Sequence, residues 1–417
     1  MHSDSNTPSP QPGDSNTPSS RLGDSNAPRL EAGALPGEAR ADYAEEEAYY
    51  AIAFSCMTGF NLAVALQLYR ELGSAKAVYD NRKNIADVVP DCSPRLVAAL
   101  QNWDDALSRA ASEMAFVSKY DIKVMTLSSD SYPSRLRECT DAPLVLYYKG
   151  SADLNQQRVI NIVGTRRCTV YGQDLVRRFV SRLRELCPQV LIVSGLAYGI
   201  DICAHRHALD CGYETVAVLA HGLEKIYPTQ HRNTAAQMVG QGGLLTEYMS
   251  YSHMDKSNFV RRNRIVAGMS DATILVESAV KGGGLITAEM AQDYGRSVFA
   301  FPGAVGARYS EGCNQIIRNN GAGLITSADD FVESMGWQSD TQLLTAKAEG
   351  IERDFFPDLT DEEKAVVSLL DGVGDLQLNM LSAQSGIAIG RLTGLLFQLE
   401  MKGVVKLMAG GNYHLLK

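Results

Sequence analysis

Val159-Ile160-Asn161-Ile162-Val163-Gly164-Thr165-Arg166-Arg167 is the part of the sequence that says most about the fold. Its first five residues form an apolar, largely β-branched run, which is typical of a strand buried on both faces. Gly164 permits a tight turn, and the pattern over Leu175–Leu186 then predicts a helix. A buried strand, a glycine turn and a helix make up the first half of a βαβ unit, which predicts a parallel sheet.

The same alternation of strand and helix continues to residue 330, with a second clear helical pattern at Thr287–Tyr294. The apolar runs predicted as strands are Val159–Val163, Val190–Val193, Thr215–Leu219, Leu244–Thr246, Thr273–Val276, Val298–Phe301 and Leu324–Ile325. Strands of this kind with crossover helices predict an α/β fold with a doubly wound, mostly parallel sheet. The order of the strands is not encoded in the pattern.

Basic or glycine-rich turns recur at or near the ends of these strands. They are Gly164–Arg167, Ser194-Gly195, Lys256–Arg264 and Lys281–Gly284. Because the carboxyl ends of parallel strands meet at one edge of a sheet, we expect these turns to converge. Backbone amides at helix starts, together with guanidinium groups, form anion sites. With no acid–base cluster nearby, the sequence predicts a nucleic acid as the anion.

The segment Lys256-Ser257-Asn258-Phe259-Val260-Arg261-Arg262-Asn263-Arg264 predicts a cationic helix start. An aromatic ring among arginines is suited to stacking a base while binding its phosphates, so Phe259 favours contact with nucleic acid. The alternative is an ordinary solvated basic face of a helix. The apolar residues Ile265–Met269 follow directly, which indicates that the segment is anchored against the sheet.

The other turns carry weaker signals. Gly164–Arg167 could be a plain strand-to-helix turn, and it lacks the G-x-G-x-x-G spacing of a dinucleotide site. The glycine-rich Lys281–Gly284 could cradle a phosphate or be a flexible loop, and it does not fit the P-loop pattern. Asp201 and His205 lie four residues apart on one predicted helix, so an acid–base or metal pair remains open beside a structural role.

Composition narrows the class of protein. The chain has 417 residues, 45% of them hydrophobic and 21% charged, which is ordinary for a soluble protein of two or three domains. Eight cysteines are scattered without a C-x-x-C pair, so neither a zinc site nor a disulfide framework is predicted. We expect no catalytic residues, no metal and no cofactor. The sequence shows no secretory signal or membrane span, so we expect a cytoplasmic protein.

The net charge of −9 is unevenly distributed. Residues 156–330 hold 18 Lys and Arg against 15 Asp and Glu, a balance of +3. The rest of the chain holds 21 against 33, a balance of −12. Binding of a polyanion must therefore come from a local basic patch and not from the overall field.

The chain divides into five expected parts. Residues 1–42 are a polar, low-complexity tail in which Asp-Ser-Asn-(Thr/Ala)-Pro recurs from Asp4, Asp14 and Asp24, and we expect it to be disordered. Residues 43–115 form a small helical domain, with Met57–Asn61 between helices. The remaining parts are the sheet domain 116–335 with its extension 116–155, a linker 336–358 and a winged-helix domain 359–417, in which helices at Glu362–Leu370, Leu376–Gly386 and Ile389–Gly403 precede a β-hairpin around Gly410-Gly411.

Taken together, these motifs resemble the DNA processing protein A family (DprA, also called Smf). The resemblance covers roughly residues 45–417 and is densest in the sheet domain. The matching residues are Gly164–Arg166, Ser194–Asp201, Tyr227-Pro228, Thr246–Tyr248, Asn258-Phe259 with Arg262–Arg264, Lys281–Thr287, Phe301–Gly303 and Gly312–Asn314. The family usually has serine where this chain has Thr165, Gly282 and Gly284.

The resemblance implies a Rossmann-like domain that dimerises, flanked by a helical domain similar to SAM or helix-hairpin-helix modules and by a winged helix. It also implies a protein that is not an enzyme, that binds single-stranded DNA without sequence preference and that helps load RecA recombinase during natural transformation. For the helical domain, a packing role is the alternative to a helix-hairpin-helix function. The DNA-binding candidates are Gly164, Thr165, Arg166, Arg167, Ser194, Gly195, Lys256, Asn258, Phe259, Arg262, Asn263, Arg264, Lys281, Gly282 and Gly283.

Two other functions are also compatible with the sequence. The span Lys281–Glu289 is similar to the glycine-rich motif of nucleoside-monophosphate phosphoribohydrolases of the lysine-decarboxylase-like family. Glu289 would then be a general base, although a glutamate on the surface of a helix is the alternative. The second rival is a transcription regulator that binds duplex DNA through the winged helix, which the acidic charge outside the centre disfavours.

Overall fold

The computed structural model describes residues 37–89, 92–337, 359–373, 376–407 and 412–416. Most of the expected tail, most of the expected linker and the Gly410-Gly411 turn lie outside these residues. By their internal contacts, the described residues before Ala115 form one compact unit and those from Ala115 onward form a second.

The first unit is helical, as the sequence predicts. Its helices are α1 (Gly37–Cys56), α2 (Leu62–Leu72), α3 (Ala75–Asp80), α4 (Ile85–Val88), α5 (Pro94–Gln101) and α6 (Asp104–Lys119), the last of which continues into the second unit. Asn61 caps the start of α2, and Gly73 ends it in the left-handed conformation with φ 86°. Helix α1 begins at Gly37, so residues 37–42 are helical and do not belong to a disordered tail.

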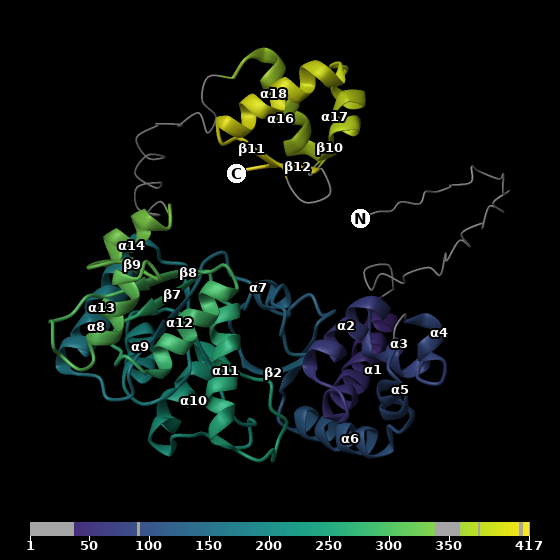
Figure 1. The fold of residues 1–417 in the computed structure, drawn as a ribbon, viewed down its shortest axis with the longest axis vertical. Coiled ribbons are helices and arrows are strands. Elements are labelled where there is room, and N and C mark those ends of the chain that lie inside the picture. The colour runs from purple at the N-terminus through teal and green to yellow at the C-terminus, as the bar shows by residue number, and fades with distance from the viewer. Residues whose placement is uncertain (1–36, 90–91, 338–358, 374–375, 408–411, 417) are drawn as a thin grey trace, which may run out of the picture. The chain divides into compact units, whose positions relative to one another are not determined.

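A nine-stranded sheet organises the second unit (Figure 1). Its strands lie in the order β1-β2-β6-β5-β4-β3-β7-β8-β9. Their bounds are β1 (Lys123–Thr126), β2 (Val145–Gly150), β3 (Val159–Val163), β4 (Leu191–Ser194), β5 (Thr215–Val218), β6 (Gly242–Thr246), β7 (Ala272–Leu275), β8 (Ser297–Ala300) and β9 (Gly323–Leu324). Strands β3 to β9 pair in parallel, whereas β2 is antiparallel to β6 and to β1. The predicted doubly wound, mostly parallel α/β fold is confirmed.

The direction of winding reverses at β3. The chain leaves β3 through α8 (Val170–Leu186) and builds β4, β5 and β6 on one side. It then returns through α11 (Lys256–Gly268) to place β7 on the other side of β3. In open α/β sheets, ligands bind in the crevice that such a reversal leaves at the carboxyl ends of the strands. We therefore expect a ligand-binding site at the loops that follow β3 and β7.

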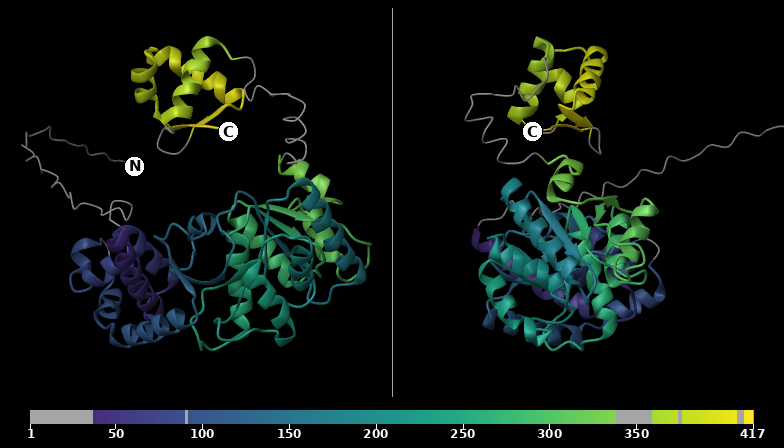
Figure 2. Two further views of the ribbon diagram at one scale, coloured as in Figure 1. Left: turned by 180° about the vertical axis from the view of Figure 1, so that it is seen from behind. Right: turned by 90° about the vertical axis from the view of Figure 1, so that its left-hand side faces the viewer.

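Helices cover both faces of this sheet (Figures 1 and 2). One face packs against α8, α9 (Ile200–Asp210) and α14 (Ala328–Ser334) around a core that includes Ile160, Ile162 and Phe331. The other carries α11 and α12 (Gly283–Asp293), which pack against each other. On that second face the Asn161 amide donates to Thr273 Oγ1 at 2.8 Å and to the Val266 carbonyl at 3.3 Å. Asn161 thereby ties β3 to β7 and to α11.

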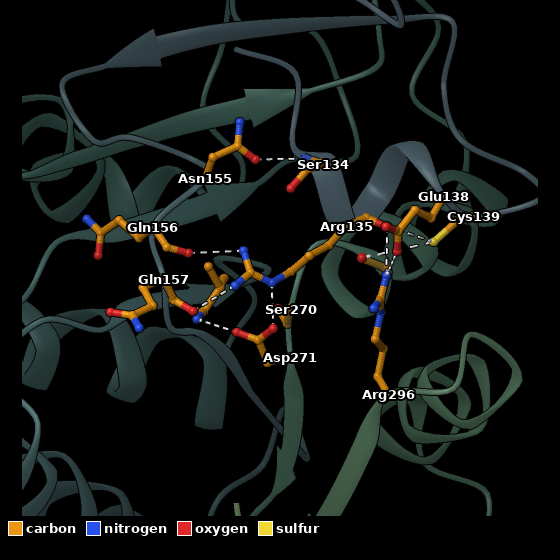
Figure 3. A network of polar contacts seen from close by, with 12 residues as sticks. Ser134, Arg135, Glu138, Cys139, Asn155, Gln156, Gln157, Ser270, Asp271 and Arg296 are labelled. Atoms are coloured by element: carbon orange, nitrogen blue, oxygen red, sulfur yellow. Dashed lines mark hydrogen bonds and ion pairs between the residues drawn. The ribbon is translucent and has the colours of Figure 1, made fainter. Parts of the chain in front are cut away.

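The extension before β3 is fastened to the sheet by Arg135, on the short helix α7 (Ser134–Arg137) (Figure 3). The Arg135 guanidinium donates to Asp271 Oδ1 at 2.5 Å and to the carbonyls of Gln156 at 3.0 Å and Gln157 at 2.9 Å. The second Asp271 carboxylate oxygen accepts from the Val159 amide at 2.8 Å. One side chain thus links α7, the entry to β3 and the entry to β7.

We expect Arg135→Ala to lower the free energy of unfolding of this unit by about 2 kcal/mol, because it removes three charge-assisted hydrogen bonds from a largely buried group. Urea denaturation of the full chain measures the change. Arg177→Ala is the control, since Arg177 is more than half exposed and pairs with Asp174 on the same helix; it should stay within about 0.5 kcal/mol of the wild type. Equal stability of both variants would contradict the role given to Arg135.

The C-terminal residues form the predicted winged helix. Its elements are α16 (Asp361–Val373), β10 (Leu376–Gln377), α17 (Leu378–Ser385), α18 (Ile389–Met401), β11 (Val405–Leu407) and β12 (Asn412–Leu415). The expected helix at Leu376–Gly386 was wrong at its start, because Leu376-Gln377 pair with β12 as a short strand.

The expected linker also begins too early: Trp337 packs on Phe331 of the sheet domain, with ring centroids 5.3 Å apart.

Candidate nucleic-acid interface

A cleft of about 200 Å³ lies at the point where the sheet reverses direction. The loops after β3 and β4 and the first turns of α11 and α12 line it. These elements bring together most of the residues proposed from the sequence: Gly164, Thr165, Arg166, Gly195, Phe259, Arg262, Asn263, Gly282 and Gly283. Turns up to 120 residues apart in the chain thus share one cleft, as the convergence argument predicts.

Glycines allow the loops to approach this closely. A Cβ atom on Gly164 would lie 2.6 Å from Ile200 Cγ1 and 2.8 Å from the Glu277 carbonyl oxygen. A Cβ atom on Gly195 would collide with the Arg262 guanidinium and lie 2.7 Å from Asp201 Oδ2. Any larger residue would push the loops apart, so the shape of the cleft depends on glycine at both positions.

Arg262 forms the floor of the cleft and is only 3% exposed. Its Nη1 donates to the Gly195 carbonyl at 2.7 Å and to the Val218 carbonyl, while Nε donates to Asn263 Oδ1 at 3.2 Å. Burial lowers the pKa of Arg262 to about 10, and the charge of Asp201 opposes that shift. Burial likewise raises the pKa of Asp201, with the Arg262 charge acting against it. The two groups are a buried, mutually stabilising pair.

Arg166 is the exposed cation of the cleft. Its guanidinium carbon lies 5.4 Å from the centroid of the Phe259 ring, which holds the charge at the mouth by a cation–π contact. The half-buried Phe259 ring is also packed edge-on against Tyr227, with centroids 5.7 Å apart. Phe259 therefore positions Arg166, in addition to any contact that it makes with a ligand.

The helix starts at this edge are not equally free to bind an anion. Glu277 is buried and accepts from the Thr169 amide at 2.8 Å and the Thr169 hydroxyl at 2.6 Å, so its carboxylate already occupies the start of α8. Asp201 accepts from the amides of Gly195 at 3.1 Å and Ala197 at 3.4 Å in the loop before α9. At α12 the N-cap is Gly282, which has no side chain to bond to the first-turn amides. The start of α12 is therefore the amide site best suited to a phosphate.

Two candidates from the sequence have buried side chains outside this cleft. Ser194 is 0% exposed, and its hydroxyl donates to the Ile162 carbonyl at 2.7 Å. Arg264 is 4% exposed; its guanidinium bonds to the Glu247 carboxylate and, at 2.6 Å, to the Asp141 carbonyl. Neither side chain has a free surface for DNA, so we assign both a positioning role and remove them from the proposed contacts.

The remaining candidates lie outside the lining of the cleft. Arg167, Lys256 and Lys281 are exposed on the loops and helix start that surround it. Asn258 is partly buried, and its Nδ2 donates to the His253 carbonyl at 3.3 Å, which stabilises the first turn of α11. The three cations are available to extend an anion site beyond the cleft itself.

Comparison with known proteins identifies the family. A sequence model described as "DNA recombination-mediator protein A" matches residues 123–336, just over half of the chain, and one described as "DprA winged helix domain" matches residues 356–411. The chain belongs to the DprA family. A putative DNA processing protein DprA of Mycobacterium tuberculosis is 33% identical over 317 residues, and Protein Smf of Escherichia coli K12 is 32% identical over 312. Each match covers 73% of this chain and 80% of the relative.

The fold agrees with that of a solved member of the family. The X-ray structure of DprA from Streptococcus pneumoniae superposes with a TM-score of 0.57 and 31% sequence identity. The match covers 69% of this chain and 97% of that chain. The DprA fold, with its Rossmann-like sheet, is therefore shown for this chain independently of the periodicity arguments.

In this DprA-family chain, Asp201 and His205 do not form the acid–base pair that their spacing allows. Asp201 accepts hydrogen bonds from the loop amides, while His205 Nδ1 lies 2.7 Å from Thr215 Oγ1. The Thr215 hydroxyl donates to the Ile192 carbonyl, so His205 donates to that hydroxyl from Nδ1. No cluster of metal-ligating side chains occurs within the described residues. The structural interpretation of this pair is the one that the geometry supports.

His205 makes the protein sensitive to acid. Complete burial lowers the pKa of His205 to about 3, below the value of about 6.5 in an unfolded chain. Between these values the unfolded state binds a proton that the folded state does not, so stability falls as pH falls below about 6.5. We expect His205→Gln to reduce the slope of the free energy of unfolding against pH by roughly 1 kcal/mol per pH unit between pH 6 and 4. Urea denaturation at several pH values measures this slope. His253 is exposed, so His253→Gln is the control. If both variants show the same slope of stability against pH, the role assigned to His205 is wrong.

The rival functions find little support in the geometry. Glu289 is exposed on α12 and is not part of the lining of the cleft, so the general-base role is not favoured. In the winged helix, α18 exposes Phe397 and Met401, and its Arg391 bonds to Glu362 at 2.8 Å. Helices that read the major groove present polar and basic side chains instead, so a role in duplex recognition is not favoured either.

Sequence reasoning missed Glu277 and the supporting role of Asp141. Glu277 directly follows an apolar strand at the switch point, and a carboxylate in that place is a signal that could have been noticed. Asp141 carries no local signal, since only the tertiary fold brings it to Arg264.

None of the helices in the described residues combines the length and apolar character that a bilayer crossing needs.

Proposed function

We propose that this chain binds single-stranded DNA without sequence preference and acts as a recombination mediator. The observation that carries the proposal is the cleft at the switch point, which is lined both by the exposed Arg166 and by the open helix start at Gly282-Gly283. A guanidinium and free backbone amides facing one cleft are the groups that bind a phosphate. Lys256 and Lys281 are exposed at the starts of α11 and α12, and they add positive charge for neighbouring phosphates.

The size and lining of the cleft favour a single strand bound through its backbone. A volume of about 200 Å³ admits part of one sugar–phosphate chain, whereas a duplex is far wider. The lining also offers few groups that could read a base: the Asn263 amide oxygen already accepts from Arg262, and the other lining residues are mainly glycine and apolar. Contacts to phosphate carry no sequence information, so the binding is indifferent to sequence.

Fluorescence anisotropy with labelled oligonucleotides tests this proposal. The full chain should bind a single strand of mixed sequence, oligo(dT) and oligo(dA) with similar affinity, and should bind the matching duplex more weakly. The logarithm of the binding constant should fall linearly with the logarithm of the salt concentration. Preference for the duplex, or strong discrimination among the single strands, would overturn it.

We also propose that the chain forms a homodimer through the sheet domain and assists RecA recombinase on the bound strand, in the context of natural transformation. Membership of the DprA family supports this. Sedimentation should show a dimer at micromolar concentration, and the chain should raise the rate at which RecA assembles on single-stranded DNA. A monomer at all working concentrations contradicts the first part, and no effect on RecA contradicts the second.

A further inference from the structure

Two tyrosine rings stand exposed beside the cleft, on loops at the carboxyl edge of the sheet. Tyr227, in the loop after β5, is 45% exposed, and Tyr198, in the loop after β4, is 41% exposed. Large aromatic rings at the surface next to a cationic site call for an explanation, because exposure of apolar area is unfavourable. Neither ring belongs to the lining of the phosphate cleft.

Tyr227 is the outer member of a row of contacting side chains that begins in the cleft. The Arg166 guanidinium lies over Phe259 at 5.4 Å, and Phe259 in turn packs edge-on against Tyr227 at 5.7 Å. Phe259 is half-buried between these two neighbours, so much of its ring is already covered. Tyr227 is the ring in this row with open surface. A base that follows a phosphate at Arg166 would meet Tyr227 on its way out of the cleft.

The backbone of Tyr227 is held rigidly. Its amide donates to His221 Nε2 at 3.2 Å, and His221 Nδ1 donates to the Gly222 carbonyl at 2.8 Å, which fixes the neutral form of the imidazole. The Thr246 hydroxyl donates to the His221 carbonyl at 2.9 Å and joins this loop to the end of β6. A ring presented on such a support loses little conformational entropy when a flat partner stacks on it.

Tyr198 is held by the same loop. Its hydroxyl donates to Gln230 Oε1 at 2.7 Å, and its ring packs edge-on against His231 with centroids 5.1 Å apart. Gln230 and His231 follow Tyr227 by three and four residues, and His231 Nδ1 bonds at 2.8 Å to the carbonyl of Leu196 in the loop that carries Tyr198. One segment, residues 221–231, thus supports both exposed rings.

We propose that Tyr227 and Tyr198 form a stacking platform for nucleobases of the bound single strand. The inference rests on the proposed function: the cleft binds the phosphates through Arg166 and the start of α12, and the bases that leave it stack on the two tyrosines. Stacking on aromatic rings is indifferent to sequence, because every base has a π-face. The platform therefore adds affinity for bases without adding a preference among them.

The test compares a normal oligonucleotide with an abasic one of the same length and charge. Tyr227→Ala should weaken binding of oligo(dT) about tenfold, a typical loss for one stacked base, and should leave binding of the abasic strand unchanged. Tyr198→Ala should behave in the same way. Tyr227→Phe should bind like the wild type, because the ring is retained. The thermal stability of each variant is measured in parallel.

Tyr120 provides a matched control. It is 43% exposed and has the Lys119 ammonium 5.1 Å from its ring centroid, but it precedes β1, which β2, β6, β5 and β4 separate from β3. Tyr120→Ala should leave both affinities unchanged.

The possible results separate the two proposals. Equal weakening of both strands by Tyr227→Ala, or no weakening of either, overturns the stacking platform. Failure of Arg166→Ala to weaken the abasic strand overturns the proposed phosphate cleft instead, whatever the tyrosine variants show.

Discussion

Arg262→Ala is expected to lower the free energy of unfolding of the sheet domain by about 3–5 kcal/mol. The buried guanidinium binds the carbonyls of Gly195 and Val218 and balances the charge of Asp201. Removing it leaves a buried carboxylate without its counter-charge and two carbonyls without a donor, each of which is costly in a region of low dielectric constant. Hydrogen exchange of the amides in β3 and β4, measured in the full chain, reports this domain separately from the others.

The neighbouring residue supplies the control. Arg261 is exposed on the same helix, so Arg261→Ala should change stability by less than about 0.5 kcal/mol. Arg262→Lys should recover only part of the loss, because a single ammonium does not reproduce the planar fork that contacts two carbonyls and Asn263. If Arg262→Ala is as stable as Arg261→Ala, the structural role assigned to Arg262 is wrong.

The double variant Arg166→Glu with Lys256→Glu is expected to lose on the order of a hundredfold in affinity for single-stranded DNA at low salt. Both side chains are exposed, and both would replace attraction to a phosphate by repulsion. Each cation lost should also lower the slope of log affinity against log salt by about 0.7, the value for single strands. The loss should be alike for every base sequence, since phosphate contacts are independent of sequence. Salt titrations by anisotropy measure both quantities.

Stability should be preserved in this double variant, which distinguishes it from Arg262→Ala. A glutamate in the first turn of α11 is favoured by the helix dipole, and Arg166 has open surface around it. The control is Arg177→Glu, a charge reversal at an exposed position of α8 outside the lining of the cleft. If Arg177→Glu weakens binding as much as the double variant, binding depends on overall charge and not on the position of Arg166 and Lys256.

The contrast between Arg262 and Arg166 shows where sequence reasoning stops. Both are arginines in basic turns predicted to contact DNA, and nothing local distinguishes them. The structure buries Arg262 and Arg264 and exposes Arg166, so two of the three have a structural partner in place of a ligand. Composition and spacing report which residues are near a site, but not which of them face solvent.

Local patterns in the chain were enough to predict the helices and strands and the edge of the sheet on which the site lies. Continuous apolar strands, glycine turns and helical periodicity are local properties of the chain, so the parallel sheet and the convergence of Gly164, Gly195, Phe259 and Gly282 could be predicted. Caps such as Asn61 and the left-handed Gly73 likewise follow from neighbouring residues. These features depend on interactions that reach only a few residues along the chain.

The order of the strands, the partners of the charged groups and the exposure of each side chain could not be predicted and depend on the folded structure. Glu277 is brought to Thr169 over 108 residues, and Arg262 to Gly195 over 67. The sequence offered four helix starts to phosphate, and Glu277 and Asp201 occupy two of them. Asp255 caps a third, the start of α11, and the start of α12 stays open. Burial and hydrogen-bond partners arise from packing between distant segments, and local periodicity carries no information about which segments meet.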